Sequence, residues 1–212
     1  MTLLRNINIG RVGAVVALFA MVGICYLAAT FDTFPGDVDA LRKLQSFRGP
    51  WLDDAAIAAS TLANAPVALA SISILSLALW LRRRKADAMA VLLVFIPEGI
   101  NQGLKELVGR PRPEFSLLAS PPESPAFPSG HAIHAILLFG LLICIAGELI
   151  KPLWLRVAVQ GLLGAAIAAV GASRVYLGVH WPSDVLGAYL LGGLSLVAIL
   201  WVRKKLIYRA FQ

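Results

Sequence analysis

The stretch Ser173-Arg174-Val175-Tyr176-Leu177-Gly178-Val179-His180-Trp181-Pro182-Ser183-Asp184 joins two long apolar runs in the last third of the chain. It places an arginine, a histidine and a carboxylate between strongly hydrophobic segments. If Pro182 occupies the first turn of the following helix, His180 lies just before that helix and Asp184 one turn inside it. Asp184 can then hydrogen-bond one imidazole nitrogen and leave the other free to attack. The structural alternative is an ordinary helix start with a carboxylate favoured by the dipole.

The composition of the whole chain indicates an integral membrane protein. Of the 212 residues, 58% are hydrophobic and 15% are charged, which is too apolar for a soluble domain of this size. The net charge of +7 could suggest nucleic acid, but the basic residues collect at the ends of apolar runs, so we expect no nucleic-acid partner. Cys25 and Cys144 lie inside apolar runs, which argues against a disulfide framework or a CxxC metal site.

Six apolar runs are long enough to cross a bilayer core, which takes about 20 residues. They cover residues 12–30, 55–80, 88–104, 131–150, 153–172 and 185–202. We therefore predict an all-α integral membrane fold, a six-transmembrane-helix bundle forming one domain over residues 1–212. The first run is expected to be a retained anchor and not a signal peptide.

Two features of these runs predict local structure. Pro66 and Pro97 are expected to kink the second and third helices. Small residues in the fifth run predict close contacts with neighbouring helices. These small residues are Gly161, Gly164, Ala165, Ala168 and Gly171.

The distribution of Lys and Arg predicts the orientation. One set of flanks carries Arg5, Arg11, Arg82, Arg83, Arg84, Lys85, Lys151, Arg156, Arg203, Lys204, Lys205 and Arg209. By the positive-inside rule these flanks and both termini are expected to be cytoplasmic. The segments 105–131 and 173–184 then share the non-cytoplasmic side of the inner cell membrane.

The outer segment 31–53 places Val38, Leu41, Leu44 and Phe47 near helical spacing, which predicts a short interfacial helix. Its role is either a connector or a lid over the site. The segment from Ser116 to Pro128 is rich in Pro and Ser and is expected to be a loop.

Two cations stand at the end of the third run. Gly109 and the prolines after it are expected to turn the chain into an extended segment, so that Lys105 and Arg112 converge on one anion. Arginine offers a planar fork to phosphate oxygens and lysine a compact charge. The alternative is a cluster of side chains that snorkel to the interface.

The sequence Pro128-Ser129-Gly130-His131 opens the fourth run. Free N–H groups at a helix start, with a glycine that permits close approach, favour an anion. Ser129 could instead be a simple N-cap. His131 is placed to donate a proton to a departing alkoxide.

Other polar residues lie inside or beside the apolar runs. His134 is three residues beyond His131, and we interpret it as a packing or hydrogen-bonding neighbour. Glu98, Asn101 and Gln102 are expected to face the bundle interior in supporting roles. The roles of Glu98 and His134 stay open at this point.

Three motifs carry a resemblance to a known family. They are Lys105-x6-Arg112-Pro113, Pro128-Ser129-Gly130-His131 and Ser173-Arg174-x5-His180-x3-Asp184. Their order and spacing resemble the signature of the type-2 phosphatidic acid phosphatase superfamily. The resemblance implies metal-independent hydrolysis of a lipid phosphate or diphosphate through a phosphohistidine intermediate. It implies His180 as nucleophile, Asp184 as its orienting partner and His131 as general acid. The implied phosphate-binding residues are Lys105, Arg112, Ser129, Gly130 and Arg174.

Three alternatives remain to be weighed. A zinc site at His131, His180 and Asp184 is disfavoured by the neighbouring cations, so we expect no metal and no cofactor. The same site could pass the phosphoryl or head group to another acceptor, and six spans with polar residues also fit a channel or transporter.

The substrate could be a polyprenyl diphosphate, phosphatidylglycerol phosphate or phosphatidate, and the sequence does not indicate an oligomeric state.

Overall fold

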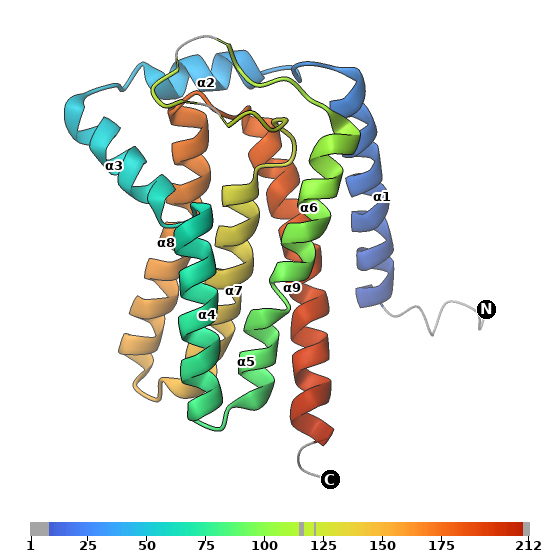
Figure 1. Cartoon of the computed structure of the whole chain (residues 1–212), viewed down its shortest axis with the longest axis vertical. Coiled ribbons are helices and arrows are strands. Elements are labelled where there is room, and N and C mark those ends of the chain that lie inside the picture. Colours follow the sequence, from blue (N-terminus) through green and yellow to red (C-terminus); the bar gives the residue numbers. More distant parts are fainter. Residues whose placement is uncertain (1–8, 115–116, 121, 210–212) are drawn as a thin grey trace.

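The computed structural model describes residues 9–114, 117–120 and 122–209, and every regular element in these ranges is an α-helix (Figure 1). The helices are α1 Ile9–Thr30, α2 Asp37–Gln45, α3 Pro50–Thr61, α4 Ala65–Leu81, α5 Lys85–Leu92, α6 Phe95–Val108, α7 Gly130–Leu149, α8 Leu153–Tyr176 and α9 Pro182–Arg209. The all-α prediction is confirmed for this part of the chain.

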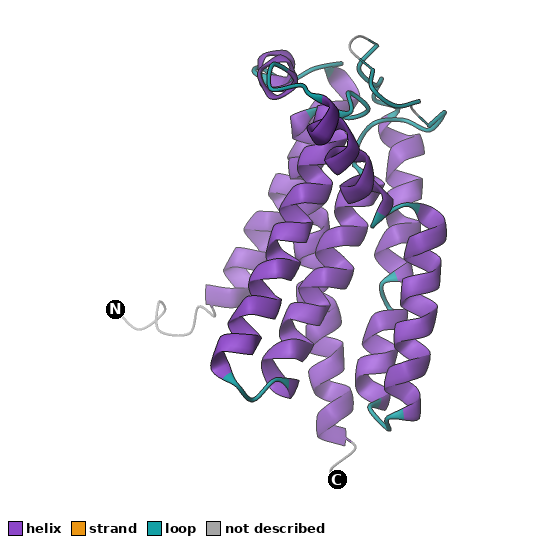
Figure 2. Cartoon of the chain, turned by 90° about the vertical axis from the view of Figure 1, so that its left-hand side faces the viewer, coloured by secondary structure: helices purple, strands orange, loops and turns teal. Residues whose placement is uncertain are grey.

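The long helices run side by side as a bundle with two distinct ends (Figures 1 and 2). One end is covered by α2, which lies across the bundle, and by the described parts of the α6–α7 loop, residues 109–114, 117–120 and 122–129. The other end carries the α4–α5 and α7–α8 connections. Of the three helices that are long and apolar enough to cross a membrane, α7 is the most deeply buried. This agrees with its apolar side chains on all sides.

The apolar helices support a multi-pass membrane protein. Within the described ranges, α7, α8 and α9 are each long and apolar enough to cross a membrane. The pair α3 and α4 would form a fourth span with a bend of 50°. These helices give three spans, or four with the bent pair, which is fewer than the six that the sequence predicts. The count of six therefore stays a prediction.

The second and third predicted runs each contain a break. The run 55–80 is divided at residues 62–64, where the Asn64 side chain caps α4 by accepting a hydrogen bond of 3.0 Å from the Val67 N–H. Pro66 lies in the first turn of α4, where its missing N–H costs no hydrogen bond. The run 88–104 is divided between α5 and α6, just before Pro97. The predicted kinks are therefore complete breaks.

Close packing of α9 depends on glycines that the sequence analysis did not single out. A Cβ atom at Gly192 would lie 2.2 Å from Ile136 Cγ2 of α7. Gly171 of α8 was predicted as a contact, and a Cβ there would lie 2.0 Å from the Tyr189 hydroxyl. Gly161 and Gly164 face open space, so the prediction that they mark a contact is wrong within this chain.

A helix is present where a short one was predicted in the segment 31–53. Leu41 of α2 is fully buried, and Gln45 donates a hydrogen bond of 2.7 Å to the Tyr176 carbonyl at the end of α8. Phe47 lies beyond the helix and is exposed. The helix α2 is thus fastened to the end of the bundle on which it lies.

The opposite end carries the predicted basic flanks, and one of them is buried. Arg203 of α9 donates to Asp87 of α5 at 2.6 Å and to both carboxylate oxygens of Glu148 of α7 at 2.8 and 2.6 Å. Arg203 is therefore part of an ion-pair network that joins three helices. The predicted flanking residues Arg5, Arg11 and Arg209 have side chains outside the part that the structure describes.

Candidate active site

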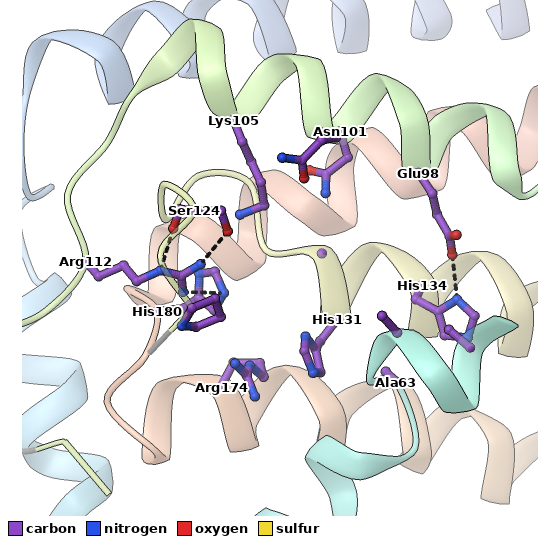
Figure 3. A pocket seen from close by; sticks show the side chains of 15 residues that line it. Ala63, Glu98, Asn101, Lys105, Arg112, Ser124, His131, His134, Arg174 and His180 are labelled. Carbon is purple, nitrogen blue, oxygen red and sulfur yellow. Dashed lines mark hydrogen bonds and ion pairs between the residues drawn. The ribbon is translucent and has the colours of Figure 1, made fainter. Parts of the chain in front are cut away.

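A cavity of about 280 Å³ lies between α4, α6, α7 and α8, next to the loop 109–129 (Figure 3). It is lined by Ala63, Ala65, Ala68, Glu98, Asn101, Gln102, Lys105, Arg112, Pro122, Ser124, Gly130, His131, His134, Arg174 and His180. The structure therefore brings together residues of all three sequence motifs.

Six of the eight predicted site residues line this cavity. They are Lys105, Arg112, Gly130, His131, Arg174 and His180. The other two, Ser129 and Asp184, are fully buried next to His131 and His180 without lining the cavity. The predicted set is thus split into cavity-facing groups and groups behind them.

The position of His180 follows from the turn between α8 and α9. Gly178 takes a positive φ of 74°, a conformation that glycine adopts without strain, and Pro182 then begins α9 as predicted. The His180 Nδ1 atom lies 3.3 Å from Asp184 Oδ2. Because a carboxylate only accepts hydrogen bonds, Nδ1 carries the hydrogen and Nε2 carries the lone pair.

The lone pair of His180 faces a cation. Arg112 Nη1 lies 3.1 Å from His180 Nε2. Burial lowers the pKa of His180 well below its usual value of 6.5, and the nearby charges of Arg112 and Lys105 lower it further. The imidazole is consequently neutral near pH 7, which is the form that can act as a nucleophile.

Three fixed cations surround His180, and we call Lys105, Arg112 and Arg174 the cationic cluster. Gly109 ends α6 with a φ of 64°, which directs the chain from Lys105 into the loop that carries Arg112. Lys105 Nζ donates to the Pro125 carbonyl at 2.6 Å. Burial lowers the pKa of Arg112.

The members of the cationic cluster are held by carbonyls and hydroxyls of distant segments. Arg112 donates to the Val179 carbonyl at 2.6 Å and to the Ser124 carbonyl at 2.8 Å. Arg174 donates to the Ser60 hydroxyl of α3, while its Nε has no partner in the described chain. These contacts fix the positions of the charges. Arg112 has a contact for each of its five N–H groups, so an anion that binds to it must replace one of these contacts.

The start of α7 supplies the second histidine. Ser129 occupies the N-cap position, but its side chain makes no capping hydrogen bond and its Oγ is buried without a described partner. Its backbone N–H donates to the Asp184 carbonyl at 3.2 Å, which ties the start of α7 to α9. His131 follows and lines the cavity beside the cationic cluster.

Two residues with open roles pair inside the same cavity. His134 Nδ1 lies 2.6 Å from Glu98 Oε1. The His134 Nε2 atom and the Asn101 Oδ1 atom are buried without a hydrogen-bond partner among the residues the structure describes. The prediction that His134 is a hydrogen-bonding neighbour agrees with this geometry.

Arg110, a buried residue that supports Asp184, was not among the site residues predicted from the sequence. Arg110 Nη1 lies 2.6 Å from Asp184 Oδ1, and Arg110 Nη2 lies 2.9 Å from Asp37 Oδ2. Asp184 thus presents one oxygen to Arg110 and the other to His180. The only sequence signal for this role was the position of Arg110 between Gly109 and Pro111, two residues before Arg112.

Asp37 of α2 was also missed. Its Oδ2 accepts from the Ser183 hydroxyl at 2.6 Å, and its Oδ1 accepts from the Ser183 N–H at 3.0 Å. The Ser183 hydroxyl in turn accepts a hydrogen bond from Arg110 Nη1 at 2.8 Å. The helix that covers the bundle end is therefore part of the network that positions Asp184.

The arrangement is chemically suited to an oxyanion. Fixed cations stabilise a dianion such as phosphate, and a neutral imidazole aligned by a carboxylate is an activated nucleophile. No group of three or more His, Cys, Asp or Glu side chains that could hold a metal ion occurs within residues 9–114, 117–120 and 122–209.

Comparisons with known proteins point to one family. The sequence model of the PAP2 superfamily matches residues 87–208. Phosphatidylglycerophosphatase B of Bacillus subtilis is 35% identical over 150 residues, covering 68% of this chain and 72% of that protein. The undecaprenyl-diphosphatase of Sulfolobus acidocaldarius is 40% identical over 76 residues, covering 36% of this chain and 32% of that protein.

A solved structure is also similar. The crystal structure of the transmembrane PAP2-type phosphatidylglycerolphosphate phosphatase from Bacillus subtilis superposes with a TM-score of 0.77 at 28% sequence identity. The match covers 91% of this chain and 96% of that one. The structural match therefore extends beyond residues 87–208, the region matched by the family model.

Proposed function

Because this chain belongs to the PAP2 superfamily, we propose that it hydrolyses a lipid phosphate or lipid diphosphate at one face of a membrane. PAP2 is the type-2 phosphatidic acid phosphatase superfamily, so the family predicted from the three motifs is confirmed. The chain is a phosphatase of the hydrolase class. The observation that carries the proposal is the His180 imidazole, which lies between the Asp184 carboxylate and the cationic cluster.

The first step of the proposed mechanism is attack by His180. A phosphoryl group bound by the cationic cluster displaces Arg112 from the lone pair of Nε2, and Nε2 attacks phosphorus. The bond from phosphorus to the leaving oxygen breaks as His131 donates a proton to that oxygen. Asp184 accepts the hydrogen bond from Nδ1 and stabilises the positive charge that the ring acquires.

The second step releases phosphate. His131, now neutral, accepts a proton from a water molecule that attacks phosphorus of the phosphohistidine. The phosphorus–nitrogen bond breaks, inorganic phosphate forms, and His180 is neutral again. Lys105, Arg112 and Arg174 offset charge on the transferring group in both steps, together with the Gly130 N–H at the start of α7. We therefore expect the reaction to need no metal ion.

The proposed substrate is an amphiphile with a terminal phosphate. The relatives include a phosphatidylglycerophosphatase and an undecaprenyl-diphosphatase, so both lipid classes are candidates together with phosphatidate. We also propose that the chain crosses the inner membrane six times, with α3–α4 and α5–α6 as broken spans and both termini cytoplasmic. This topology puts the site on the non-cytoplasmic face.

The proposal is tested by phosphate release from purified protein in detergent, with the three candidate lipids as substrates. We expect hydrolysis that survives EDTA and is blocked by vanadate. His180→Ala is expected to lower kcat by about 1000-fold or more, since it removes the nucleophile. Loss of activity on chelation, restored by zinc, would contradict the metal-free mechanism, and undiminished hydrolysis by His180→Ala would refute the nucleophile. Phosphoryl or head-group transfer to added lipid acceptors would instead identify a transferase.

A further inference from the structure

The cavity has two chemically different ends. One end holds the cationic cluster and His180, and these groups are placed to receive the phosphoryl group. The other end is lined by Glu98, Asn101 and His134, which we call the polar end. Figure 3 shows His131 between the cationic cluster and the Glu98–His134 pair. The proposed mechanism uses nothing from the polar end.

The polar end is incompletely satisfied. His134 is 2% exposed, and its Nδ1 is paired with the Glu98 carboxylate at 2.6 Å. Its Nε2 has no partner within the described chain, and the same is true of Asn101 Oδ1. Both residues line the cavity, although these two atoms are themselves buried. Buried polar atoms are nearly always hydrogen-bonded, so the two unpaired atoms are available to a polar ligand group once a side-chain rotation exposes them.

The location of His131 identifies that partner as part of the leaving group. A general acid lies beside the oxygen that departs, so whatever is attached to that oxygen continues past His131. Figure 3 places Glu98, His134 and Ala63 on the side of His131 that faces away from His180, and all of them line the cavity. The polar end is therefore next to the first few atoms of the leaving group.

We propose that Glu98, Asn101 and His134 form a binding subsite for a hydroxyl-bearing leaving group, of the kind found in a lipid with a glycerol phosphate head. A hydroxyl both donates and accepts, so it can donate to the Glu98 carboxylate or to Asn101 Oδ1, and it can pair with His134 Nε2 in either protonation state. The inference rests on the proposed function and deepens it by naming the substrate class.

The same subsite disfavours a diphosphate. When a lipid diphosphate is cleaved, the leaving group is itself a phosphate monoester, which carries negative charge directly beside the departing oxygen. The Glu98 carboxylate is a like charge on that side of His131, and it opposes such a leaving group. Phosphatidate has no free hydroxyl near its phosphate, so it makes no use of the subsite.

The test compares substrates within each variant. Purified wild type and Glu98→Gln are assayed in mixed micelles with phosphatidylglycerol phosphate, phosphatidate and a polyprenyl diphosphate at equal mole fraction. We expect wild type to prefer phosphatidylglycerol phosphate. In Glu98→Gln the ratio of kcat/KM for phosphatidylglycerol phosphate to that for phosphatidate falls about tenfold, because a site built to bind a hydroxyl loses its charged acceptor. In the same variant, the ratio of kcat/KM for the polyprenyl diphosphate to that for phosphatidate is expected to rise, because the like charge of Glu98 is removed.

Controls separate the subsite from general damage. Glu106→Gln makes the same change of charge on an exposed residue of the same helix, and it leaves the substrate ratios at the wild-type values. If Glu98→Gln does not fold, Asn101→Ala removes a second acceptor of the subsite and is expected to lower the same ratio. Equal loss on all three lipids would overturn the subsite and indicate a purely structural pair. Wild type that hydrolyses none of the three would instead refute the proposed function itself.

Discussion

At the scale of single residues, the two oxygens of Asp184 serve different partners. One accepts from Arg110, and the other accepts from the Trp181 N–H at 2.8 Å and faces His180 Nδ1. The carboxylate is therefore held in a fixed orientation from two sides. A carboxylate held in this way fixes the tautomer of His180 before any substrate binds.

The first prediction concerns the titration of His180. Its pKa is lowered well below 6.5 by burial and by the charges of Arg112 and Lys105, so the ring stays neutral on acidification until pH falls through the lowered value. We expect the nitrogen resonances of this ring in ¹⁵N-histidine NMR, assigned by their loss in His180→Gln, to titrate below pH 6.5. Arg112→Met removes one cation and is expected to move the midpoint upward. A midpoint at or above 6.5 in wild type would contradict the assignment.

The second prediction concerns Arg110, which does not line the cavity. Arg110→Lys keeps the charge, but one ammonium cannot reproduce the geometry of a guanidinium that bonds both Asp37 and Asp184. We expect kcat to fall about tenfold or more with little change in KM, because orientation is lost while substrate contacts remain. Steady-state kinetics on one lipid check this split, and a raised KM at unchanged kcat would argue for direct substrate binding.

At the scale of helices, close contacts depend on which glycines face a neighbour. Gly192 of α9 is packed against Ile136, whereas Gly164 of α8 faces open space. Gly192→Ala is expected to destabilise the protein by about 1–3 kcal/mol, since the added methyl group overpacks the α7–α9 contact. Gly164→Ala is the matched control. Thermal unfolding in detergent should show a lower Tm for Gly192→Ala only, and equal Tm values would contradict the packing.

The sequence predicted the start of α9 because its signals are local. Pro182, His180 and Asp184 lie within five positions, and one helix start fixes their relation. Arg110 could not be assigned in this way, because its partners Asp37 and Asp184 are 73 and 74 positions away. The prediction that Gly161 and Gly164 contact a neighbouring helix was wrong for a similar reason. Their spacing in the sequence shows that they lie on one face of α8, but it does not show which helix, if any, packs against that face.

At the scale of the whole molecule, charge separates the two ends of the bundle. The candidate site lies near the end covered by α2, and the basic α4–α5 connection lies at the opposite end (Figure 1). The positive-inside rule then predicts that Arg82 is cytoplasmic and that Glu123, in the loop before α7, is not.

Topology is tested with single cysteines in a Cys25→Ser, Cys144→Ser background. Both Arg82 and Glu123 are exposed positions. A membrane-impermeant maleimide added to intact cells or spheroplasts is expected to label Glu123→Cys and to spare Arg82→Cys until the membrane is opened. The reverse pattern would place the site in the cytoplasm.

The ion pairs of Arg110 connect chain segments that are made at very different times. Asp37 precedes the whole region matched by the family model, and Asp184 stands at the start of the final helix. Ribosomes deliver the amino-terminal segment first, so the carboxylate that orients His180 is the last component to arrive. If the proposed mechanism holds, the chain is expected to have no activity during its synthesis until α9, which carries Asp184, has been inserted.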